Sequence, residues 1–396
     1  MGWLRLAFKY VFYHRIKSLL LLACIFLTAF LPIAIEILLN SFEREVVARS
    51  TATPVVIGPK GSRFDLTLRS LYFRVAGTEE SDVATMPFGE VGLVDETRWA
   101  KAIPIYSKYT SKGFSIVGTN SEYFKFRDLQ IASGNTLVQI GDCVLGAGVA
   151  KALGVGPNER LLTDMENVIS IAAYPLNMYV RGVLAPSGSP DDFAIFVDLK
   201  TAWIIDGIGH GHQNVEEVDD EKLLSKKDDQ IVASAAVLPY TEITEKNIAS
   251  FHFHGDTKDF PVSSIIVVPN DVKSQTLLIG RYRNTKMDQQ LVQPNNVIEE
   301  LMNLVFRVKR FFDANAILIA ISTLLLLGLI VMLSLKLREG EMQTMFKVGA
   351  SRGTILKLQL AELGIIFFGA GILVAASVWL LNVFASNIVQ SMLLGA

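Results

Sequence analysis

Long apolar runs alternate with polar stretches along the chain and divide it into two kinds of segment. Three runs, residues 19–39, 313–335 and 362–384, are apolar almost throughout. About 20 helical residues cover the roughly 30 Å hydrocarbon core of a bilayer, so each run predicts a transmembrane helix. The first run is too long for the apolar core of a cleaved signal peptide, and Ala34-Ile35-Glu36, where an A-x-A-like cleavage site is needed, leads into more bulky residues. We therefore interpret it as a retained anchor.

The polar stretch from residue 40 to 312 has the texture of a folded domain. Short β-rich runs bounded by Gly, Pro or Asp predict strands at 54–57, 114–118, 193–197 and 264–268. Gly141–Gly156 predicts a strand followed by a helix that stops at Gly154, whereas 207–230 is polar and predicts a long loop or insertion. Residues 296–310 have helical spacing and predict a stalk helix continuous with the second span. The fold class is α+β, with a large mixed α/β domain between helices 1 and 2.

The distribution of basic residues predicts the topology. Residues 1–18 mix basic and aromatic side chains and predict an amphipathic helix in the inner interface. The segment 336–361 between the second and third spans is also basic. By the positive-inside rule both segments are cytoplasmic, which makes residues 40–312 and the tail 385–396 extracytoplasmic.

Composition excludes several classes of protein. The chain has 51% hydrophobic and 19% charged residues, and its net charge of -2 argues against a nucleic-acid partner. Two cysteines, Cys24 within an apolar run and Cys143, do not make a disulfide scaffold. No P-loop, dinucleotide fingerprint or nucleophile elbow occurs, so we expect no catalytic residue and no bound nucleotide cofactor in this chain.

Two histidine pairs are candidate metal ligands. His210 and His212 lie in GIGHGHQ, and His252 and His254 lie in FHFHGD, where strand alternation places both imidazoles on one face. Neutral imidazoles that converge from two segments suit zinc or another borderline transition metal. The alternative is a solvated strand face and a polar loop that use histidine without binding a metal.

The segment between the second and third spans carries a second candidate site. Met342, Met345 and Phe346 share one face of a predicted helix, Gly349 predicts a turn, and Ser351 is placed to cap the next helix. Such a helix suits docking into a groove of a partner, although a plain helical hairpin with a solvated loop remains the alternative.

The pattern RxxEMxxMxxVGASRxxIxxxxLxE, from Arg338 to Glu362, resembles the cytoplasmic segment of FtsX/MacB/LolC-type ABC transporter permeases, the type VII or mechanotransmission class. FSIVGTNSEYF, GDCVLGAGVAKALGVG and FAIFVDLKTAW are similar to the MacB-like periplasmic core domain. On this resemblance the ATPase-coupling residues are Arg338, Glu341, Met342, Met345, Phe346, Gly349, Ser351 and Arg352.

The resemblance implies a non-catalytic permease subunit in the inner membrane, working in export with a separate cytoplasmic ABC ATPase that binds the ATP and Mg. It also implies a homodimer or pseudo-dimer and a periplasmic adaptor or outer-membrane channel. Two alternatives remain: a non-transporting scaffold that regulates an extracytoplasmic partner such as a cell-wall hydrolase, and a membrane-anchored metal-binding protein. The family usually has four spans. The three predicted here indicate a three-span variant, a truncated chain, or a helix supplied by a partner.

Overall fold

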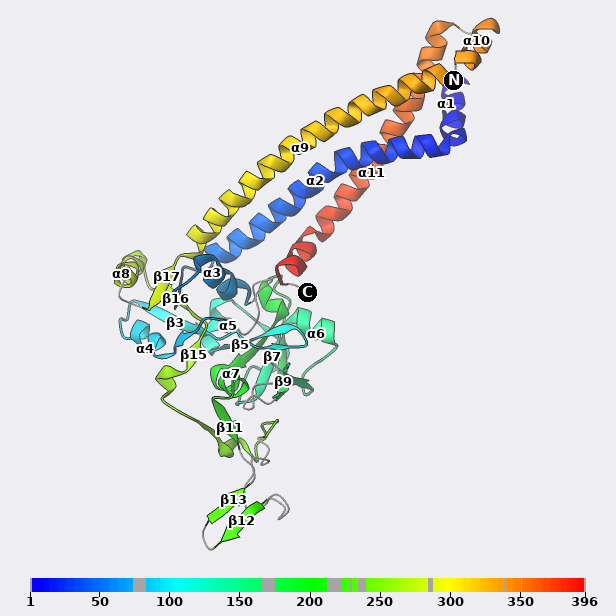
Figure 1. Cartoon of the computed structure of the whole chain (residues 1–396). Helices are drawn as coiled ribbons and strands as arrows, with labels where there is room; N and C mark the ends of the chain where they lie inside the picture. Colours follow the sequence, from blue (N-terminus) through cyan, green and yellow to red (C-terminus); the bar gives the residue numbers. More distant parts are fainter. Residues whose placement is uncertain are drawn as a thin grey trace. The chain divides into compact units, whose positions relative to one another are not determined.

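The computed structural model describes residues 2–73, 83–164, 175–211, 223–227, 230–233, 240–283, 288–337, 339–349 and 351–394. The chain forms two compact units (Figure 1). Unit 1 contains residues 1–46 and 300–389, and unit 2 contains residues 47–299 and 390–396.

Unit 1 is built from long helices. Three helices are long and apolar enough to cross a membrane: α2 (Arg15–Thr51), α9 (Pro294–Leu337) and α11 (Arg352–Leu394). They contain the three predicted spans. The shorter helices are α1 (Gly2–Tyr13) and α10 (Glu339–Lys347). The helices extend beyond the apolar runs, so residues 14–18 mostly belong to α2 and most of the tail after residue 384 belongs to α11.

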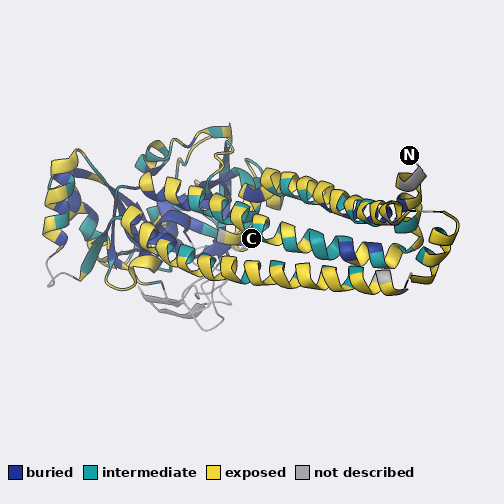
Figure 2. Ribbon diagram, turned by 90° about the horizontal axis from the view of Figure 1, so that it is seen from above, coloured by how far each residue is buried: buried dark blue, intermediate teal, exposed yellow. Residues whose placement is uncertain are grey.

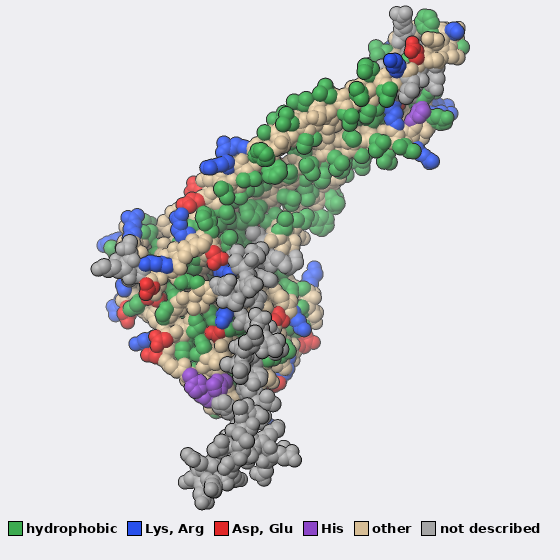
Figure 3. All heavy atoms as spheres, in the orientation of Figure 1, with side chains coloured by type: hydrophobic (Ala, Val, Ile, Leu, Met, Phe, Trp, Pro, Cys, Tyr) green, Lys and Arg blue, Asp and Glu red, His purple; other side chains and the backbone are tan. Residues whose placement is uncertain are grey.

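Polar side chains join the long helices to one another. The Thr28 and Thr323 hydroxyls lie 3.1 Å apart, and Lys309 Nζ lies 2.7 Å from Glu36 Oε2. The outward faces, by contrast, expose leucine, isoleucine, phenylalanine and tryptophan along most of their length (Figures 2 and 3). Helices satisfy their own backbone hydrogen bonds, so an apolar outer face of this kind is suited to contact with lipid.

Unit 2 is a mixed α/β domain. Its strands are β1 (Val55–Pro59), β2 (Met86–Pro87), β3 (Ala100–Ile105), β4 (Thr110–Ser111), β5 (Phe114–Thr119), β6 (Ile131–Gly134), β7 (Asp142–Leu145), β8 (Arg160–Leu162), β9 (Asn177–Leu184), β10 (Ala194–Asp198), β11 (Gly209–Gly211), β12 (Leu223–Lys227), β13 (Gln230–Ala233), β14 (Phe251–Phe253), β15 (Pro261–Val262), β16 (Ser264–Pro269) and β17 (Gln289–Val292). Its helices are α3 (Arg63–Tyr72), α4 (Gly89–Asp95), α5 (Ser121–Phe126), α6 (Ala147–Leu153), α7 (Leu199–Ile205) and α8 (Val272–Tyr282), with 3-10 turns η2 (Pro190–Phe193), η5 (Ile248–Ser250) and η6 (Thr257–Asp259).

Two larger sheets organise this unit. A four-stranded antiparallel sheet has the order β17-β1-β16-β3, and a seven-stranded mixed sheet has the order β4-β5-β10-β7-β9-β6 with β8 beside β9. The two sheets meet where Tyr106, just after β3, exchanges two 2.8 Å backbone hydrogen bonds with Gly118 of β5.

Strand β10 shows how the core is divided. Ile195 and Val197 point into one apolar cluster, which also contains Trp203 of α7. Ala194 and Phe196 point into a second cluster on the other side, which the four-stranded sheet shares. A strand that is buried on both faces is apolar at consecutive positions, which is why this one appears as a continuous run in the sequence.

The sequence predictions for this unit are confirmed in outline. β1, β5, β10 and β16 occupy the four predicted strand positions with shifts of one or two residues at their ends. The strand–helix pair β7 and α6 ends as predicted at Gly154, which takes a left-handed conformation with φ 66°. The fold class is therefore the predicted mixture of apolar spanning helices and a mixed α/β domain.

Candidate functional site

Three of the four predicted metal-ligating histidines lie on one two-stranded ribbon. Strands β11 and β14 pair antiparallel, with His210 directly opposite His252. The pairing continues past the end of β14, where the His254 N–H donates to the carbonyl of Ile208 at 3.2 Å. Residues opposite each other or two apart along an antiparallel ribbon share a face, so all three imidazoles lie on the same side. The fourth histidine, His212, lies outside the described residues.

The opposite face of the ribbon fixes this orientation. Phe251 and Phe253 pack against the core cluster that contains Trp203. The strand partners of these phenylalanines are glycines. A Cβ at Gly209 would lie 2.6 Å from the Phe253 ring, and one at Gly211 would lie 2.8 Å from the Phe251 ring. The rings can lie across β11 only because these positions have no side chain, so the apolar face turns inward and the histidines turn outward.

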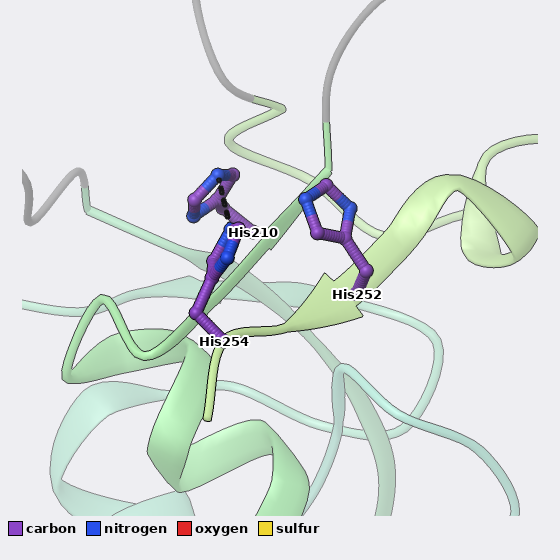
Figure 4. A group of neighbouring side chains, drawn as sticks. All are labelled: His210, His252 and His254. Carbon is purple, nitrogen blue, oxygen red and sulfur yellow. Dashed lines mark hydrogen bonds between the residues drawn. The ribbon is translucent and has the colours of Figure 1, made fainter. Parts of the chain in front are cut away.

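The three imidazoles lie close enough to share a cation (Figure 4). One nitrogen from each of His210, His252 and His254 lies within 4.8 Å of the other two. His254 Nε2 and His210 Nε2 are 3.4 Å apart. His210 is half-buried and the other two are exposed, and the space-filling view shows histidine side chains gathered on the surface of this unit (Figure 3).

A backbone carbonyl orients one of these rings. His252 Nδ1 lies 3.1 Å from the Ser250 carbonyl oxygen. Because a carbonyl only accepts hydrogen bonds, Nδ1 carries the proton in this contact, and the Nε2 of a neutral ring then presents its lone pair. This arrangement is typical of metal-binding histidines, which commonly donate their second ring N–H to a carbonyl or carboxylate.

The predicted coupling residues lie in and around α10, within unit 1. Gly349 follows the helix with φ 103°, and Ser351 Oγ accepts the Thr354 N–H at 3.3 Å as the cap of α11. Met342 and Met345 are half-buried, and Gln359 of α11 donates to Met342 Sδ at 3.7 Å. Phe346 and Val348, by contrast, are 55% and 84% exposed. The exposed apolar surface of this segment is therefore Phe346 with Val348, while both methionines are partly covered.

The remaining coupling residues are described only in part. Arg338 lies outside the described residues, and for Glu341 and Arg352 the structure describes the backbone alone.

A buried ion pair that sequence reasoning missed lies in unit 2. Arg49, in the last turn of α2, donates to both carboxylate oxygens of Asp191, at 2.6 and 2.9 Å. It also donates to the Tyr123 hydroxyl at 3.0 Å and to the Leu71 carbonyl at 3.2 Å. Only 8% of the Arg49 side chain and 1% of the Asp191 side chain are exposed. The pair fixes the end of α2 to the core of unit 2.

Burial and charge act in opposite directions on this pair. Burial alone would raise the pKa of Asp191, but the charge of Arg49 and hydrogen bonds from Arg49 and Tyr123 lower it below its ordinary value. For Tyr123, burial first and then the negative charge of Asp191 raise the pKa of the phenol, which therefore stays protonated and donates to Asp191 Oδ1 at 2.5 Å. The partners are 142 residues apart, and no spacing in the sequence links them.

Comparison with known proteins identifies the class of this chain. The family model described as the MacB-like periplasmic core domain matches residues 18–245, more than half of the chain. The chain belongs to this family, and it is an ABC transporter permease-type subunit. With three span-capable helices it is an inner-membrane protein that has an extracytoplasmic domain. The family implies an ATPase partner.

Solved structures with some similarity to this chain include domains of three other proteins. The periplasmic region of MacB from Actinobacillus actinomycetemcomitans is 11% identical, with 65% of this chain and 98% of that chain covered and a TM-score of 0.34. The extracellular domain of the noncanonic ABC-type transporter YknZ from Gram-positive bacteria is 11% identical, with coverages of 60% and 98% and a TM-score of 0.33. A domain of a permease protein from Porphyromonas gingivalis is 7% identical, with coverages of 60% and 86% and a TM-score of 0.27. No curated protein matches the chain. Family membership rests on the sequence match over residues 18–245.

Proposed function

We propose that this chain is the membrane subunit of a mechanotransmission ABC transporter. In this function ATP hydrolysis by a separate cytoplasmic ATPase moves the α10 segment, and the long helices relay that movement to the extracytoplasmic domain for export or extrusion of a substrate. ATP and Mg are bound by the partner, and this chain is not an enzyme. The active assembly is a homodimer or pseudo-dimer.

The observation that carries the proposal is the way two unbroken helices end inside the extracytoplasmic domain. The last turn of α2 is held by the buried Arg49–Asp191 pair. The first turns of α9 bury Val297 and Ile298, and Val297 lies in the cluster shared by both sheets. Packed interiors do not deform continuously. A shift of either helix therefore also moves the core residues of the domain that it contacts.

The docking part of the proposal rests on the exposed surface of α10. Phe346, which is 55% exposed, presents an apolar patch beside Lys347 on the face that it shares with Met342 and Met345. Lipid does not cover a segment that has left the membrane, so a partner that buries this patch gains hydrophobic stabilisation. Gly349 and the Ser351 cap set the direction of the chain between α10 and α11.

Co-purification of the ATPase tests this assignment. Phe346→Glu places a carboxylate in the docking surface, where burial without a partner is costly. We expect the variant to insert normally and to retain at least tenfold less ATPase than the wild type in detergent extract. Met345→Glu, on the same face but half-buried against the hairpin, should act in the same direction.

The matched control is Thr344→Glu, which adds the same charge on the side of α10 opposite Phe346. Thr344 is exposed, and its hydroxyl donates to the Gly340 carbonyl of the same helix. The control should retain the ATPase at the wild-type level. If Phe346→Glu retains as much ATPase as the wild type, the docking surface is refuted. The segment between α9 and α11 would then be the loop of a plain helical hairpin.

A further inference from the structure

We propose that His210, His252 and His254 form an exchangeable binding site for a divalent transition metal ion, with Zn²⁺ the best fit. The site lies on the outward face of the β11–β14 ribbon (Figure 4). Nothing in the transport proposal requires it, and it stands or falls independently of ATPase coupling.

The donor chemistry selects the class of ion. Three imidazole nitrogens suit Zn²⁺, Cu²⁺, Ni²⁺ and Co²⁺, whereas Ca²⁺ and Mg²⁺ take oxygen ligands. The described residues supply no carboxylate to this group, so its selectivity among metal ions depends on imidazole nitrogen ligands alone. We therefore expect millimolar Ca²⁺ and Mg²⁺ to leave Zn²⁺ binding unchanged.

The spacing of the ligand atoms fits a tetrahedral ion. With Zn–N bonds of 2.0–2.1 Å, two tetrahedral ligands lie about 3.3 Å apart. His210 Nε2 and His254 Nε2 are 3.4 Å apart, which is already this separation. The ligand atoms of all three residues lie within 4.8 Å, so a small side-chain rotation of His252 completes the trio.

The ribbon itself is organised for this arrangement. His210 and His252 are fixed opposite each other by the β11–β14 register, and the phenylalanines on the other face pack against the core. The Ser250 carbonyl selects the His252 tautomer that leaves Nε2 as the ligand atom. A polar face that only contacts solvent would not need the strand register, the phenylalanine packing and the Ser250 contact together.

The number of ligands indicates an exchangeable site. Structural zinc sites are closed by four protein ligands, whereas sites with three protein ligands keep a position for water or another molecule. Exposure of His252 and His254 also leaves a path for the ion to enter and leave. The domain core does not depend on these side chains, so the protein should fold without the metal.

Metal binding to the full-length chain in detergent tests the proposal. The protein carries an affinity tag without histidine, is stripped with EDTA, and is dialysed against Zn²⁺ before its metal content is measured. We expect close to one Zn²⁺ per wild-type chain, which EDTA removes reversibly. Co²⁺ bound in its place should give the visible absorption of a four-coordinate site.

Variants identify the ligands. His252→Gln and His254→Gln should each weaken Zn²⁺ binding at least tenfold, and the double variant should abolish it, because one imidazole alone does not hold the ion. His14→Gln, in the turn between α1 and α2, is the matched control and should leave the stoichiometry at one. Unchanged circular dichroism of all variants shows that the ribbon substitutions do not act through unfolding. Zinc content that is unchanged in the double variant, or close to zero in the wild type, would overturn the site.

Discussion

The buried Arg49–Asp191 pair gives the sharpest energetic test of how α2 is attached to the extracytoplasmic domain. Arg49→Met keeps much of the length of the side chain and removes its charge. The Asp191 carboxylate, 1% exposed, then loses two short hydrogen bonds and its only cationic hydrogen-bond donor among the described residues. Breaking a buried pair by removing one partner costs about 3–5 kcal/mol, since it leaves an uncompensated buried charge.

That cost is large compared with the stability of a domain. A difference of about 1.4 kcal/mol changes an equilibrium tenfold, so Arg49→Met should raise the unfolded population by a factor of about 10² or more. Domains are stable by only about 5–15 kcal/mol, and the variant should be visibly destabilised at ordinary temperature. The measurement is the fraction of the full-length chain in detergent that resists a short protease pulse across a urea series.

The double variant Arg49→Met/Asp191→Asn separates the charge effect from lost packing. The introduced amide remains able to accept from Tyr123, and the double variant removes both charges of the pair, so it should recover at least half of the lost stability. Lys101→Met, which breaks an exposed pair with Glu122, is the control and should have no measurable effect. A loss below about 1 kcal/mol for Arg49→Met, or no recovery in the double variant, would refute the reasoning.

Three further predictions concern the same assembly. The pKa of Asp191 is lower in the folded state than in the unfolded state. The ionised carboxylate therefore stabilises the folded domain fully above the unfolded pKa of about 4, and this stabilisation is lost as the pH falls through the folded pKa. The stability difference between wild type and Asp191→Asn should be constant from about pH 5 to 8 and shrink below about pH 4. Gly349→Val should reduce the amount of ATPase that co-purifies, because a β-branched residue at the Gly349 φ of 103° is strained by about 1 kcal/mol or more. The control Gly353→Val, within α11, should have a smaller effect. A reporter fused after Ala396 should be extracytoplasmic, since Gln390 Nε2 donates to the Gly188 carbonyl of the extracytoplasmic unit at 2.8 Å; a cytoplasmic signal would contradict the three-span topology.

The sequence alone determined the features that depend on local chemistry. The spanning helices follow from runs of about 20 apolar residues, because the bilayer acts on each helix separately. The strands β1, β5, β10 and β16 follow from short apolar runs with turn residues at their ends. The resemblance over the α10 segment and the core domain likewise led to the family that the match over residues 18–245 shows.

Tertiary structure decided which distant residues meet. Alternation places His252 and His254 on one face, but only the β11–β14 register brings His210 to them, and a register shift of one residue would turn it away. Similarly, the pattern of the α10 helix predicts a shared apolar face, yet contact with α11 covers Met342 and leaves Phe346 exposed. Arg49 and Asp191 pair across 142 residues because the core excludes water from both. Pairing of this kind is a property of the packed interior, and sequence spacing does not encode it.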